Sequence, residues 1–62
     1  MNNTNELLTP SEVADILRIH TLTVYSYIKR GRLRAVHLGR TYRILPGDLN
    51  QFIESHRYAP AG

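Results

Sequence analysis

Seven cationic side chains lie between residues 18 and 43 of this 62-residue chain, and no acidic residue lies among them. That segment carries a formal charge of +7, while residues 1–17 carry −3 and residues 44–62 carry −1, which gives the net charge of +3. A dense, unneutralised set of cations suits electrostatic contact with a polyanion such as DNA. The alternative is a solvated surface that happens to be rich in arginine. The cations are Arg18, Lys29, Arg30, Arg32, Arg34, Arg40 and Arg43.

The remaining polar residues do not form a pattern typical of a catalytic or metal-binding site. The three histidines are widely spaced and the chain has no cysteine, so no set of side chains has metal-ligand spacing. Glu12 and Asp15 share one helix turn, without a nucleophile or a cleft to serve. A chain of this length buries only about 60% of its unfolded surface, which leaves no room for a deep cavity. We therefore expect no enzyme activity, no metal and no cofactor.

The cysteine content and the hydropathy of the sequence indicate in which cellular compartment the protein is expected. The absence of cysteine fits a reducing cytoplasm better than secretion. No apolar run approaches the 18 or so residues of a membrane span, and residues 1–6 have neither a basic leader nor an apolar stretch. We expect a cytoplasmic protein without a membrane partner.

Two short helices must carry much of the basic segment. Thr9, Pro10 and Glu12 have the spacing of a capping box with proline in the first turn, which predicts a helix over about residues 10–18. Its inward stripe is expected to be Val13, Ile16 and Leu17. A second helix is expected over about 21–30, with Val24, Tyr27 and Ile28 inward and Gly31 ending it in the left-handed conformation. The short interruption between them suggests a helix-turn-helix.

A change of period after Gly31 predicts a β-hairpin. Val36 and Leu38 alternate with polar neighbours, Gly39-Arg40 forms the turn, and Tyr42 and Ile44 alternate again. These four apolar side chains, like Tyr27, are expected to face the core. The segment 46–48 ends the hairpin, and a third helix to about residue 56 is expected from Leu49, Phe52 and Ile53. The predicted fold is mainly α with a small β-hairpin, in the order α-α-β-β-α.

The domain boundaries follow from these elements. Residues 1–6 and 57–62 are polar or lack a period, so flexible ends are expected there. Residues 7–56 are expected to form one domain.

Several short stretches resemble the excisionase-type winged helix-turn-helix family, which is related to the DNA-binding head of the mercury-resistance regulators. The resemblance implies duplex DNA binding, with the second helix in the major groove and the hairpin wing against the backbone or the minor groove. The stretches that carry it are Leu8-Thr9-Pro10-Ser11-Glu12-Val13-Ala14, Thr23-Val24-Tyr25, Gly31-Arg32-Leu33, Gly39, Arg43-Ile44 and Asp48-Leu49.

The same resemblance implies an excisionase, that is, a recombination directionality factor of a bacterium or phage. Such proteins bind repeated sites near an attachment site, bend the DNA and direct an integrase to excision, in association with the nucleoid. The alternatives are a small transcription regulator of the same fold and a protein-docking module. The charge distribution favours DNA over docking, because a docking face more often has an apolar centre.

The candidate DNA-binding residues lie on the second helix and on the wing. Hydroxyl side chains can bond several bases and an apolar side chain can meet a thymine methyl, although plain surface residues are the alternative on this helix. Tyr25 is expected either to bond a phosphate or to cover the edge of the core. The helix candidates are Thr21, Leu22, Tyr25, Ser26, Lys29 and Arg30, and the wing and flank candidates are Arg32, Arg40 and Arg43.

The sequence departs from the family pattern around the turn. Arg18 stands where the family usually has glycine, and His20 where it has a serine cap. Thr21 and Ser26 stand where the family often has arginine or lysine. DNA affinity is therefore expected to lean on Lys29, Arg30, Arg32, Arg40 and Arg43.

Self-association is expected only on DNA. The predicted apolar stripes are used up in one small core, so little remains for an obligate dimer interface. Copies on adjacent sites are expected to meet head to tail, an acidic surface against the basic flank of the next copy. The acidic candidates are Glu12, Asp15, Asp48 and Glu54.

Overall fold

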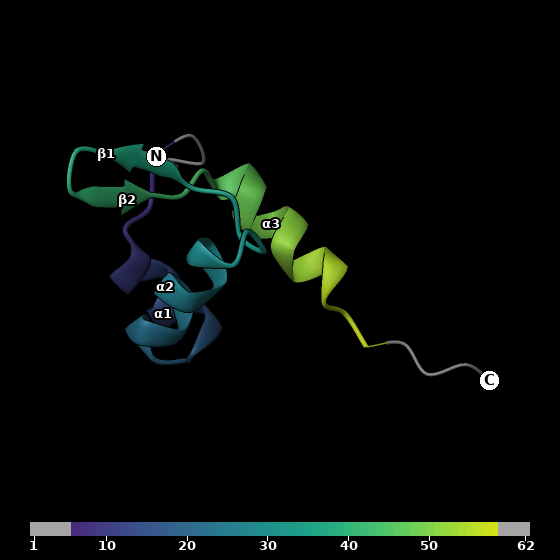
Figure 1. The fold of residues 1–62 in the computed structure, drawn as a ribbon. Helices are drawn as coiled ribbons and strands as arrows, with labels where there is room; N and C mark the ends of the chain where they lie inside the picture. The colour runs from purple at the N-terminus through teal and green to yellow at the C-terminus, as the bar shows by residue number, and fades with distance from the viewer. Residues whose placement is uncertain (1–5, 59–62) are drawn as a thin grey trace.

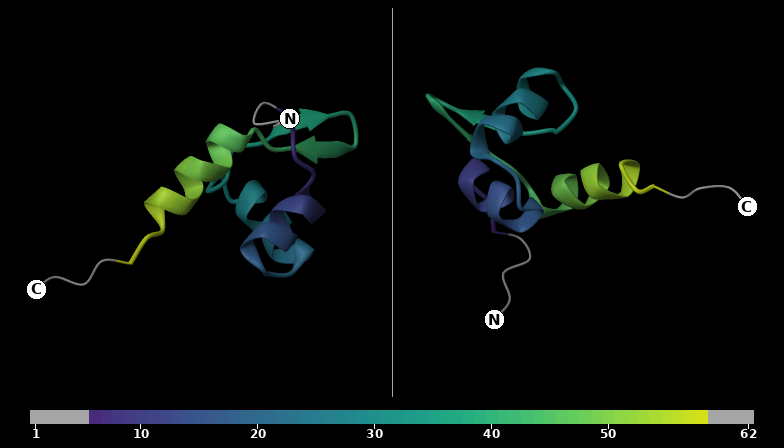
Figure 2. Two further views of the ribbon diagram at one scale, coloured as in Figure 1. Left: turned by 180° about the vertical axis from the view of Figure 1, so that it is seen from behind. Right: turned by 90° about the horizontal axis from the view of Figure 1, so that it is seen from below.

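The computed structural model describes residues 6–58, which form three helices and a two-stranded antiparallel hairpin. The elements, in chain order, are α1 (Pro10–Leu17), α2 (Thr21–Lys29), β1 (Val36–Leu38), β2 (Thr41–Arg43) and α3 (Pro46–Ser55). In Figure 1, α1 and α2 pack together below the hairpin. The views of Figure 2 show α3 extending on the side opposite the hairpin turn. The predicted winged helix-turn-helix order is confirmed, while the predicted flexible ends lie almost entirely outside the described residues.

The start of α1 is the predicted capping box. The Thr9 amide donates a hydrogen bond to Glu12 Oε1 at 2.8 Å, and the Glu12 amide donates one to Thr9 Oγ1 at 3.0 Å. Pro10 occupies the first turn, where its missing N–H leaves no partner unsatisfied. A purely local sequence signal therefore fixes where the helix-turn-helix begins.

The turn between α1 and α2 has left-handed backbone at Arg18, with φ 60° and ψ 48°. A residue with a Cβ atom adopts this conformation at a cost of about 1–2 kcal/mol, which is why glycine is common there. The Arg18 amide bonds back to α1, and the Ile19 amide donates to the Ala14 carbonyl at 3.0 Å. His20 follows as the N-cap of α2 without a side-chain capping bond. The turn thus has a left-handed, strained arginine at the position where glycine was the expected residue.

One core joins the three helices to the loop after α2 and to Ile44, the residue after β2. Tyr27 of α2 packs on this core, its ring centroid 5.0 Å from that of Phe52 on α3, as predicted. The isolated bridge between Leu8 and Ile44, with N···O distances of 2.8 and 2.7 Å, ties the N-terminal segment to the end of β2. The buried side chains are Val13, Ala14, Val24, Leu33, Ile44, Leu49 and Phe52.

One predicted core position on α1 is wrong, and one core residue in the loop after α2 was not predicted. Ile16 is 54% exposed, and Ala14 takes its place in the core. The buried stripe of α1 starts at Pro10 and runs through Val13 and Ala14, and at 100° per residue Ile16 falls well off that stripe. Leu33, which has no periodic apolar neighbours, is only 1% exposed.

The hairpin register corrects the predicted inward set. The two-residue turn pairs Leu38 with Thr41, His37 with Tyr42 and Val36 with Arg43. Directly paired residues point to the same face, so Val36 and Leu38 lie on the face opposite Tyr42. Leu38 is accordingly 49% exposed rather than in the core.

The turn and the last helix follow the local sequence. Gly39 opens the two-residue turn with φ 62°, a value that glycine adopts without a steric penalty. Helix α3 begins at Pro46, earlier than the predicted Leu49, because proline is well suited to the first helical position. None of the helices among residues 6–58 is both long and apolar enough to cross a membrane.

Candidate nucleic-acid interface

The outward face of α2 begins with one strongly exposed apolar side chain. Leu22 is 80% exposed, whereas Thr21, Tyr25 and Ser26 are half-buried. Lys29, in the last turn of the helix, is exposed. The α2 candidates thus form a neutral N-terminal half followed by a basic end.

The loop after α2 turns two arginines outward around a buried leucine. Gly31 has φ 77°, the left-handed conformation predicted for it. The amides of Arg32 and Leu33 both donate to the Tyr27 carbonyl, at 2.9 and 3.2 Å. Because Leu33 is buried, its neighbours Arg32 and Arg34 are held on the surface, where both are exposed. Arg34 is a further candidate, because it is among the seven cations of the basic segment but not among the predicted DNA-binding residues.

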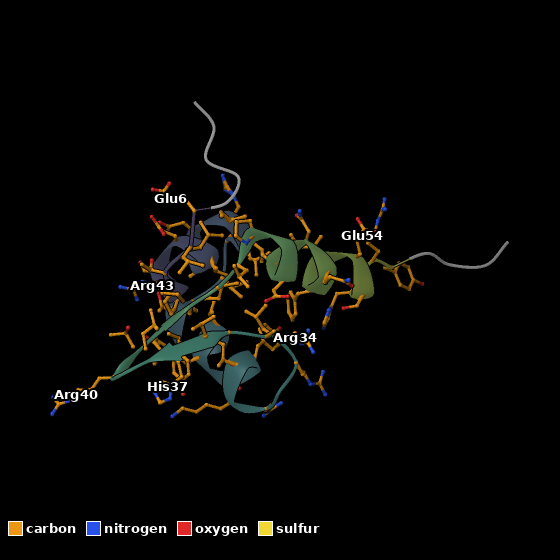
Figure 3. All side chains as sticks on the ribbon, turned by 90° about the horizontal axis from the view of Figure 1, so that it is seen from above. Glu6, Arg34, His37, Arg40, Arg43 and Glu54 are labelled. Carbon is orange, nitrogen blue, oxygen red and sulfur yellow. The ribbon has the colours of Figure 1, made fainter. Side chains whose placement is uncertain are left out.

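The two wing arginines have different environments. Arg40 is exposed at the hairpin turn, and it projects beyond the end of the hairpin in Figure 3. Arg43 is half-buried, and its Nη1 donates to Thr41 Oγ1 at 3.1 Å and to the Tyr42 carbonyl at 2.8 Å. It lies on the opposite face of the hairpin from His37. Arg40 is therefore the wing cation with its guanidinium free to meet an anion, while that of Arg43 already braces β2.

Aromatic rings join the hairpin to α2. The Tyr42 ring stacks on the His37 ring with centroids 4.8 Å apart and an angle of 20° between the planes. The Tyr25 ring meets Tyr42 edge-on at 6.0 Å. Both roles predicted for Tyr25, a phosphate bond and cover for the edge of the core, stay predictions, since the contact seen is with the hairpin. The wing is thus attached directly to the helix that precedes it in the helix-turn-helix.

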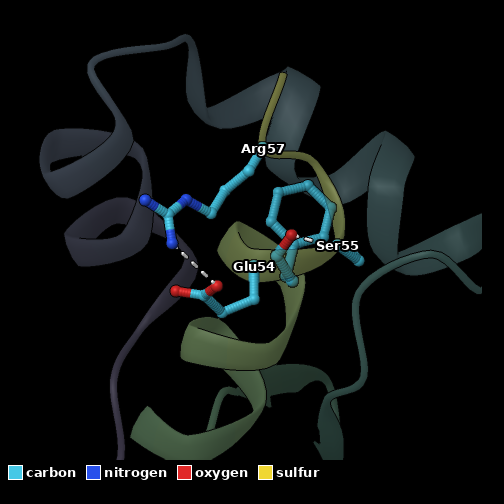
Figure 4. Close-up of polar contacts among 4 residues, drawn as sticks. Glu54, Ser55 and Arg57 are labelled. Atoms are coloured by element: carbon cyan, nitrogen blue, oxygen red, sulfur yellow. Dashed lines mark hydrogen bonds and ion pairs between the residues drawn. The ribbon is translucent and has the colours of Figure 1, made fainter. Parts of the chain in front are cut away.

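The cations of the basic segment are not neutralised by internal ion pairs. Across residues 6–58 the single ion pair joins Arg57 to Glu54, at 3.2 Å, outside that segment. Figure 4 shows this pair at the C-terminal end of α3, beside Ser55. The charges from residue 18 to residue 43 are therefore available to an external anion.

Figure 3 shows how these charges are distributed. Arg34, His37 and Arg40 lie along one side of the molecule, while Glu6 and Glu54 lie on the other. Arg43 lies across the hairpin from His37, on the side of Glu6, so the separation seen along the sequence persists only in part.

A hollow of about 370 Å³ separates the loop after α2 from α3. Arg32 and Arg34 line it on the loop side, and Asp48 and Gln51 line it on the helix side. In the described part of the chain, no group of three or more His, Asp or Glu side chains is placed to hold a metal ion. This hollow has charges of both signs, whereas the hairpin tip, residues 38–41, has Arg40 as its one charged side chain.

Comparison with known proteins identifies the type of domain. The family described as "Helix-turn-helix domain" matches residues 7–57. Two Mycobacterium tuberculosis proteins, from strains CDC 1551 / Oshkosh and ATCC 25618 / H37Rv, are 37% identical over 57 residues, 92% of this chain and 72% of theirs. Both are provisionally named as DNA-binding proteins.

A third relative is much longer. The uncharacterized protein YvgK of Bacillus subtilis (strain 168) is 44% identical over 52 residues, 84% of this chain and 17% of its own length. No solved structure gave a significant match. With the predicted fold in place and the family match spanning both helices, the hairpin and α3, the chain belongs to the helix-turn-helix domain family.

Proposed function

We propose that the chain binds duplex DNA without catalysing a reaction, in the bacterial or phage cytoplasm. Helix α2 enters the major groove, and the hairpin acts as a wing on the backbone or in the adjacent minor groove. The helix contacts come from Thr21, Leu22, Tyr25, Ser26, Lys29 and Arg30, and the wing and flank contacts from Arg32, Arg40 and Arg43.

One observation carries this proposal. The seven cations between residues 18 and 43 have no carboxylate partner among residues 6–58, although five acidic residues are present in the chain. Unpaired cations repel one another, and a polyanion that neutralises them relieves this repulsion while releasing its own counterions. The provisional DNA-binding names of the mycobacterial relatives support the same interpretation.

The direct test is a titration of the chain with random-sequence duplex DNA at low salt. DNA binding predicts a saturable complex without any particular sequence, because phosphate contacts supply most non-specific affinity. A protein-docking module would give no complex in this titration.

Within DNA binding, we propose an excisionase role. The chain would bend attachment-site DNA and direct an integrase to excision, and its resemblance to excisionases supports this role over transcription regulation. A circular-permutation gel assay measures the bend, and an integrase-dependent excision assay with and without the chain measures the direction of recombination. Unbent DNA and unchanged excision would instead favour a transcription regulator.

Replacing Arg40 by alanine is expected to weaken binding to all duplexes by several-fold and to leave the fold intact. The side chain is exposed at the turn, and exposed substitutions usually change stability by within about 0.5 kcal/mol. Loss of one phosphate contact lowers the salt dependence by about one unit. Fluorescence anisotropy measures the affinity and circular dichroism the melting temperature.

Arg57→Ala is the matched control for Arg40→Ala. It removes an arginine that is already paired with Glu54 and lies outside the basic segment. Its DNA affinity should match that of the unmodified chain. A sharp fall in melting temperature for Arg40→Ala would make Arg40 a structural residue and contradict the wing assignment.

We further propose that copies assemble head to tail on adjacent sites. Glu12 is engaged in the capping box and Glu54 pairs with Arg57. Asp15 and Asp48 are therefore the acidic candidates whose carboxylates have no hydrogen-bond or ion-pair partner among residues 6–58. Such contacts are weak alone and gain strength when DNA holds the copies close.

Sedimentation of the free protein is therefore expected to give a monomer. Footprints on a natural site should show several repeats filling over a narrow concentration range, and Asp15→Asn should widen that range. A tight dimer without DNA, or repeats that fill independently, would contradict this assembly.

A further inference from the structure

Leu22 is the most exposed large aliphatic side chain among residues 6–58. It is 80% exposed, and the next such side chain, Ile16 on α1, is 54% exposed. Leu22 is the second residue of α2, and side chains near the N-terminus of a recognition helix are those that reach base edges. Its exposure therefore falls where an apolar contact with DNA is geometrically available.

The rest of the N-terminal half of α2 has none of the side chains that typically read guanine, adenine or cytosine. Guanine is read by arginine or lysine, adenine by asparagine or glutamine, and cytosine by aspartate or glutamate. Residues 21–28 include none of these six types, and their polar groups are the hydroxyls of threonine, serine and tyrosine. Hydroxyl groups bond to several bases and discriminate weakly between them. The first cation of the helix is Lys29, two turns after Leu22.

Thymine is the one standard base with an apolar group in the major groove, its C5 methyl. We infer that the preferred DNA sites of this chain contain a thymine whose C5 methyl packs against Leu22, and that this contact is the main base-specific contact of the first two turns of α2. The inference rests on the proposed DNA binding with α2 in the major groove. Phosphate contacts from Lys29 onward supply affinity, and Leu22 supplies selectivity.

The test uses deoxyuridine, which pairs as thymidine does and lacks only the methyl group. A preferred duplex is first selected from a random pool with the full chain. Each thymidine in the footprint is then replaced in turn by deoxyuridine, and the affinity is measured by fluorescence anisotropy. At one position we expect the affinity to fall about threefold to fivefold, the effect of leaving one methyl group unburied.

The variant Leu22→Ala tests whether the loss of affinity for the deoxyuridine duplex is due to the Leu22 side chain. Because Leu22 is exposed, truncating it should leave the fold intact. The variant is expected to bind the thymidine duplex as weakly as the unmodified chain binds the deoxyuridine duplex, and to bind the two duplexes equally. Ile16→Ala, an exposed apolar truncation on α1, is the control and should keep the full deoxyuridine effect.

Three results would overturn the inference while leaving DNA binding intact. They are a pool that yields no preferred duplex, affinities unchanged by deoxyuridine at every position, and an equal deoxyuridine loss in Leu22→Ala. Failure to bind any duplex at low salt is a different result, because it removes the proposed function itself.

Discussion

Raising the monovalent salt concentration from about 50 to about 200 mM is expected to weaken binding to random-sequence duplex about 250- to 1,000-fold. The physical reason is counterion release, in which each phosphate neutralised contributes about −0.9 to the slope of log affinity against log salt. Four to six neutralised phosphates, roughly the number that the exposed cations of the basic segment can reach, give a slope of about −4 to −5. Anisotropy titrations at four or five salt concentrations measure it.

The slope also shows how much each arginine contributes to the salt dependence of binding. Arg40→Ala should reduce its magnitude by about one. Arg43→Ala should reduce it less, since the Arg43 guanidinium already donates to Thr41 and to the Tyr42 carbonyl. A slope near zero for the unmodified chain would exclude phosphate contacts and with them the DNA-binding proposal.

Leu33→Ala is expected to destabilise the domain by about 2–5 kcal/mol, because it leaves a cavity in a core that cannot easily collapse. Leu33 is 1% exposed and belongs to the same buried cluster as Val24 and Phe52. Small domains have a total free energy of unfolding of only about 5–15 kcal/mol, so the loss is a large share of it. A thermal melt followed by circular dichroism should show the transition at least about 10 °C lower.

Leu38→Ala is the matched control, with the same chemical change at a side chain that is 49% exposed. Its melting temperature should shift by only a few degrees, because little apolar surface is buried there. Equal destabilisation by the two variants would mean that the hairpin register places Leu38 in the core, contrary to the pairing of Leu38 with Thr41.

Features encoded by neighbouring residues were predictable from the sequence. The Thr9–Glu12 capping box, Gly31 in the left-handed conformation and the Gly39-Arg40 turn each depend on a few adjacent residues, and all three are confirmed. The order of elements followed from them, because apolar stripes between such signals leave few other folds.

Features that depend on long-range packing were harder to predict. Ile16 and Ala14 are both apolar residues of α1, and the elements packed against α1 select the stripe of Pro10, Val13 and Ala14, from which the helical period excludes Ile16. Leu33 lies in a loop, where no periodicity marks a core residue. The Val36 and Leu38 error has a different origin, since the two-residue turn already fixes which faces of the strands coincide.

The candidate site divides in the same way. Its charges follow from the sequence, but their lack of ion-pair partners among residues 6–58 needed the structure, because acidic residues outside the segment could have folded against them. The differing freedom of Arg40 and Arg43 was not predictable, because it depends on where the Arg43 side chain folds back on its own strand.

The edge-on contact between Tyr25 and Tyr42 joins α2 to the hairpin, so it favours one spacing between these two elements. The Tyr25 and Tyr42 ring centroids lie 6.0 Å apart, and the Tyr42 ring is in turn stacked on His37 within the hairpin at 4.8 Å. A duplex engaged by both elements is therefore expected to present its two contact points at that spacing, or to widen, narrow or bend until it does. Base steps that the protein never touches would then influence affinity through their stiffness alone.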